Sequence, residues 1–187
     1  MADLDDVIAR ARGGDEAAFT VLFRRFQPLL LRYLRGVAVT SEDLASEVWL
    51  DVVRGLGMFS GDETGFRSWL FTIAHRRVVD AHRARKRRPE TLVAAVPDSA
   101  FGLDAAEALE EQLGTDDAIA LISSLPADQA EVVLLRVVAG LDVAAVATVV
   151  GKRAGAVRVL SHRGLKRLAE MMGDRAANET QIPRSAI

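Results

Sequence analysis

The stretch that decides the fold runs from Phe66 to Arg88, FRSWLFTIAHRRVVDAHRARKRR. Its first half places apolar residues at i, i+4, i+7, i+8 and i+12, the spacing of one helical face. Its last thirteen positions hold seven Lys or Arg residues. The stretch therefore predicts one helix that starts in a core and ends in a cluster of cations. Such a cluster is typical of a surface that binds phosphate backbones. The alternative is a solvated helix end whose cations complement the macrodipole, which needs fewer of them.

Charge is distributed unevenly along the 187 residues. Residues 1–88 carry 15 Lys or Arg against 12 Asp or Glu, residues 89–131 carry none against 10, and residues 132–187 carry 9 against 4. The whole chain has a net charge of −2, which hides this pattern. The partner is indicated by this arrangement of two basic segments around an acidic one, and not by the net charge.

The composition suits small helical units, because half of the residues are hydrophobic and only 5% are aromatic. The sequence has no cysteine, which excludes disulfides, thiolate metal sites and cysteine nucleophiles. The N-terminus lacks the apolar run of a signal peptide, and no window reaches ~18 uninterrupted apolar residues. We therefore expect a cytoplasmic protein without membrane insertion.

The apolar spacing predicts a first helical domain over residues 1–88. Its expected helices are 4–12, 15–35, 41–56 and 66–88. We expect Gly13 and Gly36 to end the first two helices and Thr40 to cap the third, and we expect Pro28 to kink the second. A glycine-rich loop, 57–65, leads to the basic helix.

A second helical domain is predicted over residues 115–172. Its expected helices are 115–125, 127–140, 142–150 and 154–172. Residues 89–114 are acidic, contain two prolines and lack a strong period, so we expect a flexible tether between independently folded domains. Residues 173–187 lack periodic apolar positions and are expected to be a disordered tail. The predicted fold class is all-α, with two small helical domains joined by a flexible acidic linker.

Residues 142–168 have the pattern of a helix-turn-helix, with a short helix, a turn at Gly151 and a second helix. A helix of ~10–12 Å diameter fits the major groove, where Arg can pair with guanine. A plain three-helix bundle is the alternative for this stretch taken alone. The cations expected to point outward and to bind DNA are Lys152, Arg153, Arg158, His162, Arg163, Lys166 and Arg167.

Several landmarks resemble one known family. Trp69-Leu70-x-x-Ile73-Ala74 with Asp80 and Arg83, and Glu42-Asp43-Leu44-x-x-Glu47 before them, resemble the second region of bacterial sigma factors of the extracytoplasmic-function (ECF) class. The run Leu125-Pro126-x-x-Gln129, followed by Leu135-Arg136, Gly140-Leu141, Gly151, Val157-Arg158 and Arg167-Leu168, is similar to the fourth region of that class. The resemblance covers about residues 4–172, in the family's order.

The resemblance implies a transcription initiation factor that brings RNA polymerase core to promoters and is controlled by an anti-sigma factor. The first domain would melt and read the −10 element as a single strand, and the second would read the −35 element as a duplex. The basic helix would contribute the DNA-binding residues Arg67, Arg76, Arg77, Arg83, Arg85, Arg87 and Arg88. The acidic stripe of the third helix would contribute the polymerase contacts Asp43, Glu47 and Asp51.

The chain departs from the family pattern at four positions. Arg76 stands where the family usually has Asn, Ala145 where it has Glu, Ala156 where it has Thr, and Ser161 where it has an apolar residue. These departures concern the −10 base pocket and the −35 recognition helix.

No pattern indicates catalysis, a cofactor or a bound metal. His75 and His82 share a helical face but lie about two turns, or ~10 Å, apart, too far to bind one metal without a third element. Trp69 is expected in the core, with a base-stacking wedge as the alternative. Trp49 is expected either at a partner surface or against the first helices. The nearest rival function is a one-component helix-turn-helix regulator that binds duplex operators without polymerase. A nucleic-acid enzyme is a more distant rival.

Overall fold

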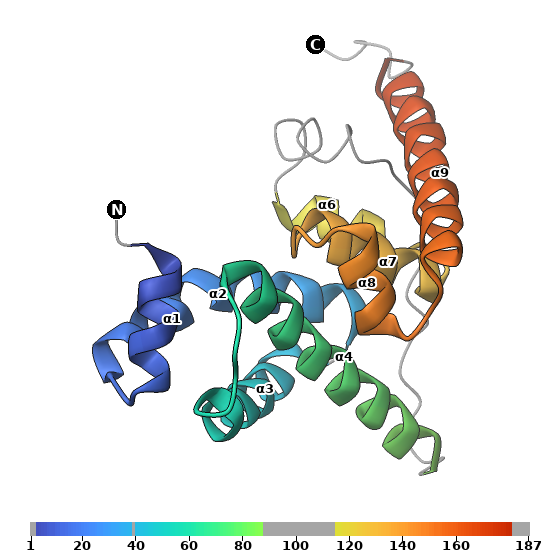
Figure 1. Ribbon diagram of the computed structural model, residues 1–187. Coiled ribbons are helices and arrows are strands. Elements are labelled where there is room, and N and C mark those ends of the chain that lie inside the picture. The colour runs from blue at the N-terminus through green and yellow to red at the C-terminus, as the bar shows by residue number, and fades with distance from the viewer. Residues whose placement is uncertain (1–2, 39, 88–114, 181–187) are drawn as a thin grey trace, which may run out of the picture.

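The computed structural model describes residues 3–38, 40–87 and 115–180, and these residues fold into helices joined by short connections. The N-terminal half holds α1 to α4, and the C-terminal half holds α6 to α9 (Figure 1). The helices are α1 (Leu4–Arg12), α2 (Glu16–Val37), α3 (Ser41–Leu56), α4 (Glu63–Arg87), α6 (Thr115–Ser123), α7 (Ala127–Val137), α8 (Val143–Val150) and α9 (Ala154–Thr180). The all-α prediction is confirmed.

The short turn between α1 and α2 is fixed by Asp15. Its Oδ1 accepts hydrogen bonds from the N–H groups of Ala17 (2.9 Å) and Ala18 (3.0 Å), which caps α2. Its Oδ2 binds Arg10 Nη2 at 2.6 Å and so ties the end of α1 to the start of α2. The Ala18 N–H and then the Arg10 guanidinium lower the pKa of Asp15.

Aromatic side chains fill the core where α2 crosses α4. The rings of Phe26 and Phe66 lie 5.2 Å apart, and Tyr33 meets Phe71 edge-on at 5.4 Å. All four side chains are fully buried. Because Phe66 and Phe71 lie near the start of the basic helix, this core anchors that end and leaves the cationic end of α4 to extend away (Figure 1).

The C-terminal half contains the expected helix-turn-helix. Asp142 caps α8 by accepting from the Ala145 N–H at 2.7 Å. Gly151 ends α8 at φ 64°, ψ 30°, a left-handed conformation that glycine adopts without a steric penalty. The chain then enters α9, whose Val157 and Leu168 are buried against the rest of this half.

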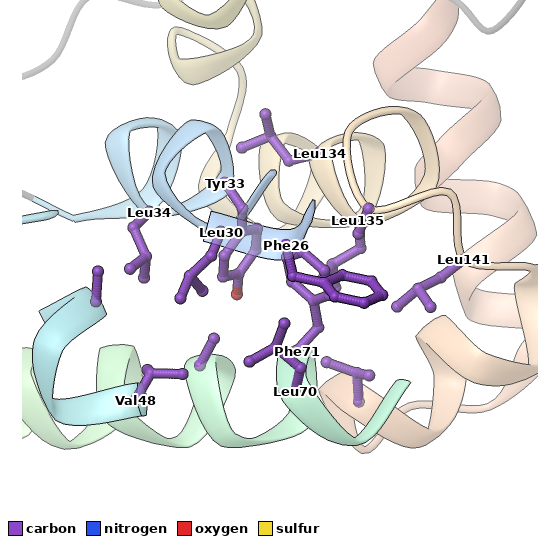
Figure 2. Close-up of a cluster of buried hydrophobic side chains, with 14 of the residues drawn as sticks. Phe26, Leu30, Tyr33, Leu34, Val48, Leu70, Phe71, Leu134, Leu135 and Leu141 are labelled. Carbon is purple, nitrogen blue, oxygen red and sulfur yellow. The ribbon is translucent and has the colours of Figure 1, made fainter. Parts of the chain in front are cut away.

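The two halves pack against each other. Helix α2 packs against α6 and α7, α4 packs against α8, and the buried apolar residues form one continuous cluster. Figure 2 shows Leu135 and Leu141 of the C-terminal half in one group with Phe26, Leu30 and Phe71 of the N-terminal half. The expected linker, 89–114, lies outside the described residues.

The helices differ from expectation at several places. Helix α2 continues through Gly36 to Val37, so this glycine does not end it, and α7 ends at Val137 rather than at 140. Helix α4 begins three residues early, at Glu63, because the Asp62 carboxylate accepts from the Gly65 N–H at 2.8 Å and caps it. Thr40 occupies the cap position of α3 but its side chain makes no capping hydrogen bond. Helix α9 continues past the expected end at 172 as far as Thr180. The extension lacks apolar periodicity, but its Ala, Arg and Glu residues favour helix and no proline interrupts it.

We predict opposite effects for two glycine-to-alanine changes beside the turn. Gly151→Ala should lower the free energy of unfolding by about 1–2 kcal/mol, because a residue with a Cβ is strained at a positive φ. Gly155→Ala should stabilise by roughly 0.5–1 kcal/mol, because this glycine lies in the first turns of α9 and a Cβ there meets open space. Urea unfolding followed by helical circular dichroism measures both. Equal destabilisation by the two changes would contradict the assigned turn.

Candidate nucleic-acid interface

The exposed cations of α4 lie along its second half. Arg76, Arg83, Arg85 and Arg87 are all exposed, whereas Arg88 lies outside the described residues. Arg83 approaches the similarly exposed Asp80 at 3.5 Å, a solvated pair that holds it only weakly. These side chains present positive charge to solvent beyond the aromatic core, as a phosphate-binding surface requires.

Arg77 differs from these neighbours, because its guanidinium turns back onto α3. Its Nε donates to Asp51 Oδ2 at 2.7 Å and its Nη1 donates to Glu47 Oε2 at 3.1 Å. The pair with Asp51 raises the pKa of Arg77 above its ordinary value. Arg77 therefore joins α3 to α4 here, and two carboxylates neutralise its charge.

These contacts of Arg77 involve two of the three residues in the acidic stripe that was expected to face polymerase. Asp51 is half-buried under Arg77, and Glu47 is exposed but shares that guanidinium. Asp43 is exposed and makes no ion pair with any residue that the structure describes. Asp43 is therefore the member of the stripe whose full charge is available to a partner.

Arg67, expected to bind DNA, is also engaged within the molecule. Its Nη2 donates to Glu63 Oε1 at 2.8 Å, and its guanidinium lies 5.4 Å from the centre of the Phe26 ring. Its Nη1 donates to the backbone carbonyl of Ala139 in the C-terminal half at 3.2 Å. Arg67 thus lies at the junction of the two halves.

An aromatic group lies where the glycine-rich loop enters α4. Phe59 stacks on Trp69 with ring centres 5.0 Å apart and an interplanar angle of 25°, and Phe66 meets both rings edge-on. Neither Phe59 nor Trp69 is fully buried. Flat partly exposed rings of this kind can stack on unpaired bases. Phe59 was not singled out from the sequence, although an aromatic in a glycine-rich loop was a usable signal.

Trp49 belongs to the core rather than to a partner surface. It is buried, its ring packs on Phe19 and Phe23, and its Nε1 donates to Gln27 Oε1 at 2.5 Å. The alternative left open by the sequence is thereby resolved in favour of packing against the first helices.

Helix α9 presents a row of cations on its outer face. Arg158, His162 and Lys166 follow one another at i, i+4 and i+8, and all three are exposed. Arg153, Arg163 and Arg167 are exposed as well. Lys152 instead donates to Asp128 Oδ2 of α7 at 2.9 Å, so its charge is partly neutralised. The opposite face of α9 supplies the buried Val157 and Leu168.

Ser161, which stands at a usual apolar position of the family, is buried on that inner face. Its Oγ has no hydrogen-bond partner within the described part of the chain. This departure therefore lies on the packed face of α9 and not among its exposed cations.

The described residues offer no site of another kind. They contain no group of three or more His, Asp or Glu side chains placed to hold a metal ion. None of the helices that the structure describes is long and apolar enough to cross a membrane. His75, one of the two histidines considered above, contacts Glu131 of α7 through Nδ1 at 2.6 Å.

Comparison with known proteins assigns both halves. The family model for Sigma-70 region 2 matches residues 22–88, and that for Sigma-70, region 4 matches residues 115–168. The ECF RNA polymerase sigma factor SigD of Mycobacterium tuberculosis (strain ATCC 25618 / H37Rv) is 34% identical over 179 residues, which cover 89% of this chain and 82% of SigD. The ECF RNA polymerase sigma factor BldN of Streptomyces coelicolor is 31% identical, with 94% of this chain and 68% of BldN covered.

A solved structure shares the fold. In the structure of CnrH in complex with the cytosolic domain of CnrY, a chain aligns with a TM-score of 0.63 at 21% identity. The alignment covers 92% of this chain and 99% of that one. At this identity the likeness concerns the arrangement of helices alone.

We predict that two adjacent arginines of α4 contribute differently to stability. Arg77→Ala should lower the free energy of unfolding by about 1 kcal/mol, since it removes the cation that Asp51 and Glu47 share and leaves Asp51 only its contact with the exposed Arg54. Arg76→Ala, at an exposed position, should change it by less than about 0.5 kcal/mol. Urea unfolding gives both values. In an Asp51→Asn background most of the Arg77 effect should vanish, and an undiminished effect would refute the pairing.

Proposed function

The chain belongs to the extracytoplasmic-function class of RNA polymerase sigma factors, and from that membership we propose how its surfaces divide the work of initiation. Sigma factors are transcription initiation factors, and this one directs RNA polymerase core to promoters. Our proposal adds that it has no catalytic activity of its own and acts in the cytoplasm beside polymerase. The observation that supports the division of work is the pair of cationic helical faces, one on α4 and one on α9, in the two matched regions.

Helix α9 is proposed to read the −35 element as a duplex. Its outer row starts with Arg158, one residue after the buried Val157 and near the N-terminal end of the helix. In helix-turn-helix proteins this end of the second helix reaches base edges. Arg153, His162, Arg163, Lys166 and Arg167 extend the cationic face, where they are suited to phosphates as well as bases.

The start of α4 and the loop before it are proposed to capture the melted −10 strand. Phe59 and Trp69 offer flat faces for unstacked bases, and the exposed Met58 lies in the same loop. The exposed Arg76, Arg83, Arg85 and Arg87 would bind the strand's phosphates. Arg76, in place of the family's Asn, would change how a flipped base is held.

The outer face of α3 is proposed to bind polymerase core. Asp43 and Glu47 supply negative charge, and the half-exposed Leu50 and Val53 supply apolar surface. This combination fits a basic, partly apolar helical partner. Control by an anti-sigma factor, which the family implies, completes the proposal.

Run-off transcription with purified core polymerase tests the function as a whole. The purified chain should form a complex with core and start transcription only from templates that carry its promoter. The rival function of a one-component regulator would instead give duplex binding by the chain alone and no dependence on core.

We predict that Asp43→Lys weakens binding to core polymerase by about tenfold or more, since like charges across an interface cost several kcal/mol. Asp117→Lys is the matched control, because Asp43 and Asp117 are both exposed and both occupy the third position of their helices. The macrodipole effect on helix stability is then the same in both variants. Affinity is measured by titrating labelled chain with core, with circular dichroism as the check on folding.

Asp43 is a cleaner test than the rest of the stripe. Changing Glu47 or Asp51 to Lys would also repel Arg77 and disturb the contact between α3 and α4. Equal affinities of the Asp43→Lys and Asp117→Lys variants for core would remove this face from the interface.

We predict different effects for two arginines of the C-terminal half. Arg158→Ala should weaken the free energy of binding to the preferred −35 sequence by about 1–3 kcal/mol and relax the preference at one or two base pairs. Arg153→Ala should weaken binding to all −35 sequences alike. It should also lower the slope of log binding constant against log salt concentration by about one. Holoenzyme binding to a panel of −35 variants at two salt concentrations separates the outcomes. A uniform loss for Arg158→Ala would make it a phosphate contact.

A further inference from the structure

One apolar side chain lies at the centre of the outward face of α9. Val159 is 48% exposed, although large hydrophobic side chains are mostly buried in the described part of the chain. It stands two residues after the buried Val157 and two residues before the buried Ser161. Because an α-helix turns about 100° per residue, each of these intervals rotates the side chain by about 200°. Val159 therefore points almost directly away from the packed side of α9.

The neighbours of Val159 on this face are small or cationic. Gly155 and Ala156, four and three residues earlier, are exposed and carry no side-chain atom beyond Cβ. Arg158 precedes Val159 directly, and Arg163 follows one helical turn later; both are exposed. The N-terminal end of α9 thus presents an apolar centre with positive charge beside it.

Neither phosphate binding nor helix stability explains a valine at this position. Its side chain has no charge and no hydrogen-bonding group, so it adds nothing to a contact with the DNA backbone. Valine is also a weaker helix former than alanine or lysine. A single exposed valine is common on a helix that faces only water. Val159 differs because it lies on the helix that is proposed to enter the groove.

The major groove offers one kind of methyl group to such a side chain. Guanine, adenine and cytosine present hydrogen-bond donors and acceptors there, whereas thymine also presents its C5 methyl group. Contact between this methyl group and a valine removes apolar surface of both from water. Because a valine side chain is short, the helix backbone must come close to the base edges. Gly155 and Ala156 leave room for that approach, since no long side chain stands one turn before Val159 on this face.

We propose that Val159 is a specificity-determining residue of α9, which selects a thymine in the −35 duplex through the C5 methyl group. The inference rests on the proposed reading of the −35 element by α9 and adds the base that its apolar centre recognises. Consecutive Cα atoms lie about 3.8 Å apart, close to the spacing of roughly 3.4 Å between successive bases of one strand. The thymine should therefore adjoin the base pairs whose preference depends on Arg158.

A selection experiment supplies the DNA on which the proposal is tested. Holoenzyme assembled from the full chain and polymerase core enriches duplexes from a pool of random sequence. The enriched −35 element should hold a thymine on one strand, next to the base pairs whose preference Arg158→Ala relaxes. Enrichment of no sequence would refute the proposed reading of the −35 element and the thymine contact together.

Deoxyuridine then removes the C5 methyl group and leaves base pairing intact. Each thymine of the enriched −35 element is replaced singly, and holoenzyme affinity is measured by competition with a labelled duplex. At one position the wild-type affinity should fall roughly three- to tenfold, the factor for losing the burial of about one methyl group. Val159→Ala should bind the thymine and deoxyuridine duplexes equally. If the element is enriched but no replacement weakens wild-type binding, or if Val159→Ala keeps the full difference, the thymine contact alone is refuted.

Val21→Ala is the matched control for Val159→Ala. Val21 lies on α2 and is 46% exposed, so the two substitutions change helix propensity and surface exposure alike. The control should keep the wild-type difference between thymine and deoxyuridine. Neither variant removes a charge, so both should keep the wild-type slope of log binding constant against log salt concentration. A changed slope for Val159→Ala would show that the substitution acts through the phosphate contacts, and it would overturn the direct contact with thymine.

Discussion

The structure depends on helix α2 being buried along two sides. Its 22 residues span about 33 Å at 1.5 Å per residue. Phe26 and Tyr33 meet rings of α4, while Gly36 and the Tyr33 hydroxyl meet α7. A helix that packed along one side alone could support only one half of the chain. Because α2 packs in both directions, the position of the C-terminal half follows from the core of the N-terminal half.

Ion pairs within the molecule sort the cations into two groups. Arg77 and Lys152 each bind an acid on a neighbouring helix. They therefore hold helices together and contribute little to the electrostatic field outside the protein. Arg76 and Arg158 are exposed and supply the field that attracts a polyanion. A chain with a net charge of −2 can therefore present two positive faces, because many of its acids lie elsewhere or are already paired.

The sequence predicts the features of the fold that a local pattern determines. It predicts fewer of the contacts between residues that lie far apart in the sequence. Apolar spacing located the described helices, and Gly151 marked the helix-turn-helix turn. The family landmarks identified both regions. Three contacts have no local signal: Arg77 with Asp51, Arg67 with the Ala139 carbonyl, and Tyr33 with Glu131. The last two join residues 72 and 98 positions apart in the sequence. Independent domains were predicted because residues 89–114 are acidic, contain two prolines and lack a strong period, and none of these features reports on contacts between the helices on either side.

Residues at the junction of the halves combine apolar burial with a polar contact. Leu134 and Leu135 are buried in one cluster with residues of the N-terminal half, and burial of this kind has no preferred direction. Glu131 adds direction, because its contacts with the Tyr33 hydroxyl and with His75 are strong only when donor and acceptor are aligned. The apolar residues therefore supply most of the stability of this junction, and the Glu131 carboxylate fixes how α7 lies against α2 and α4.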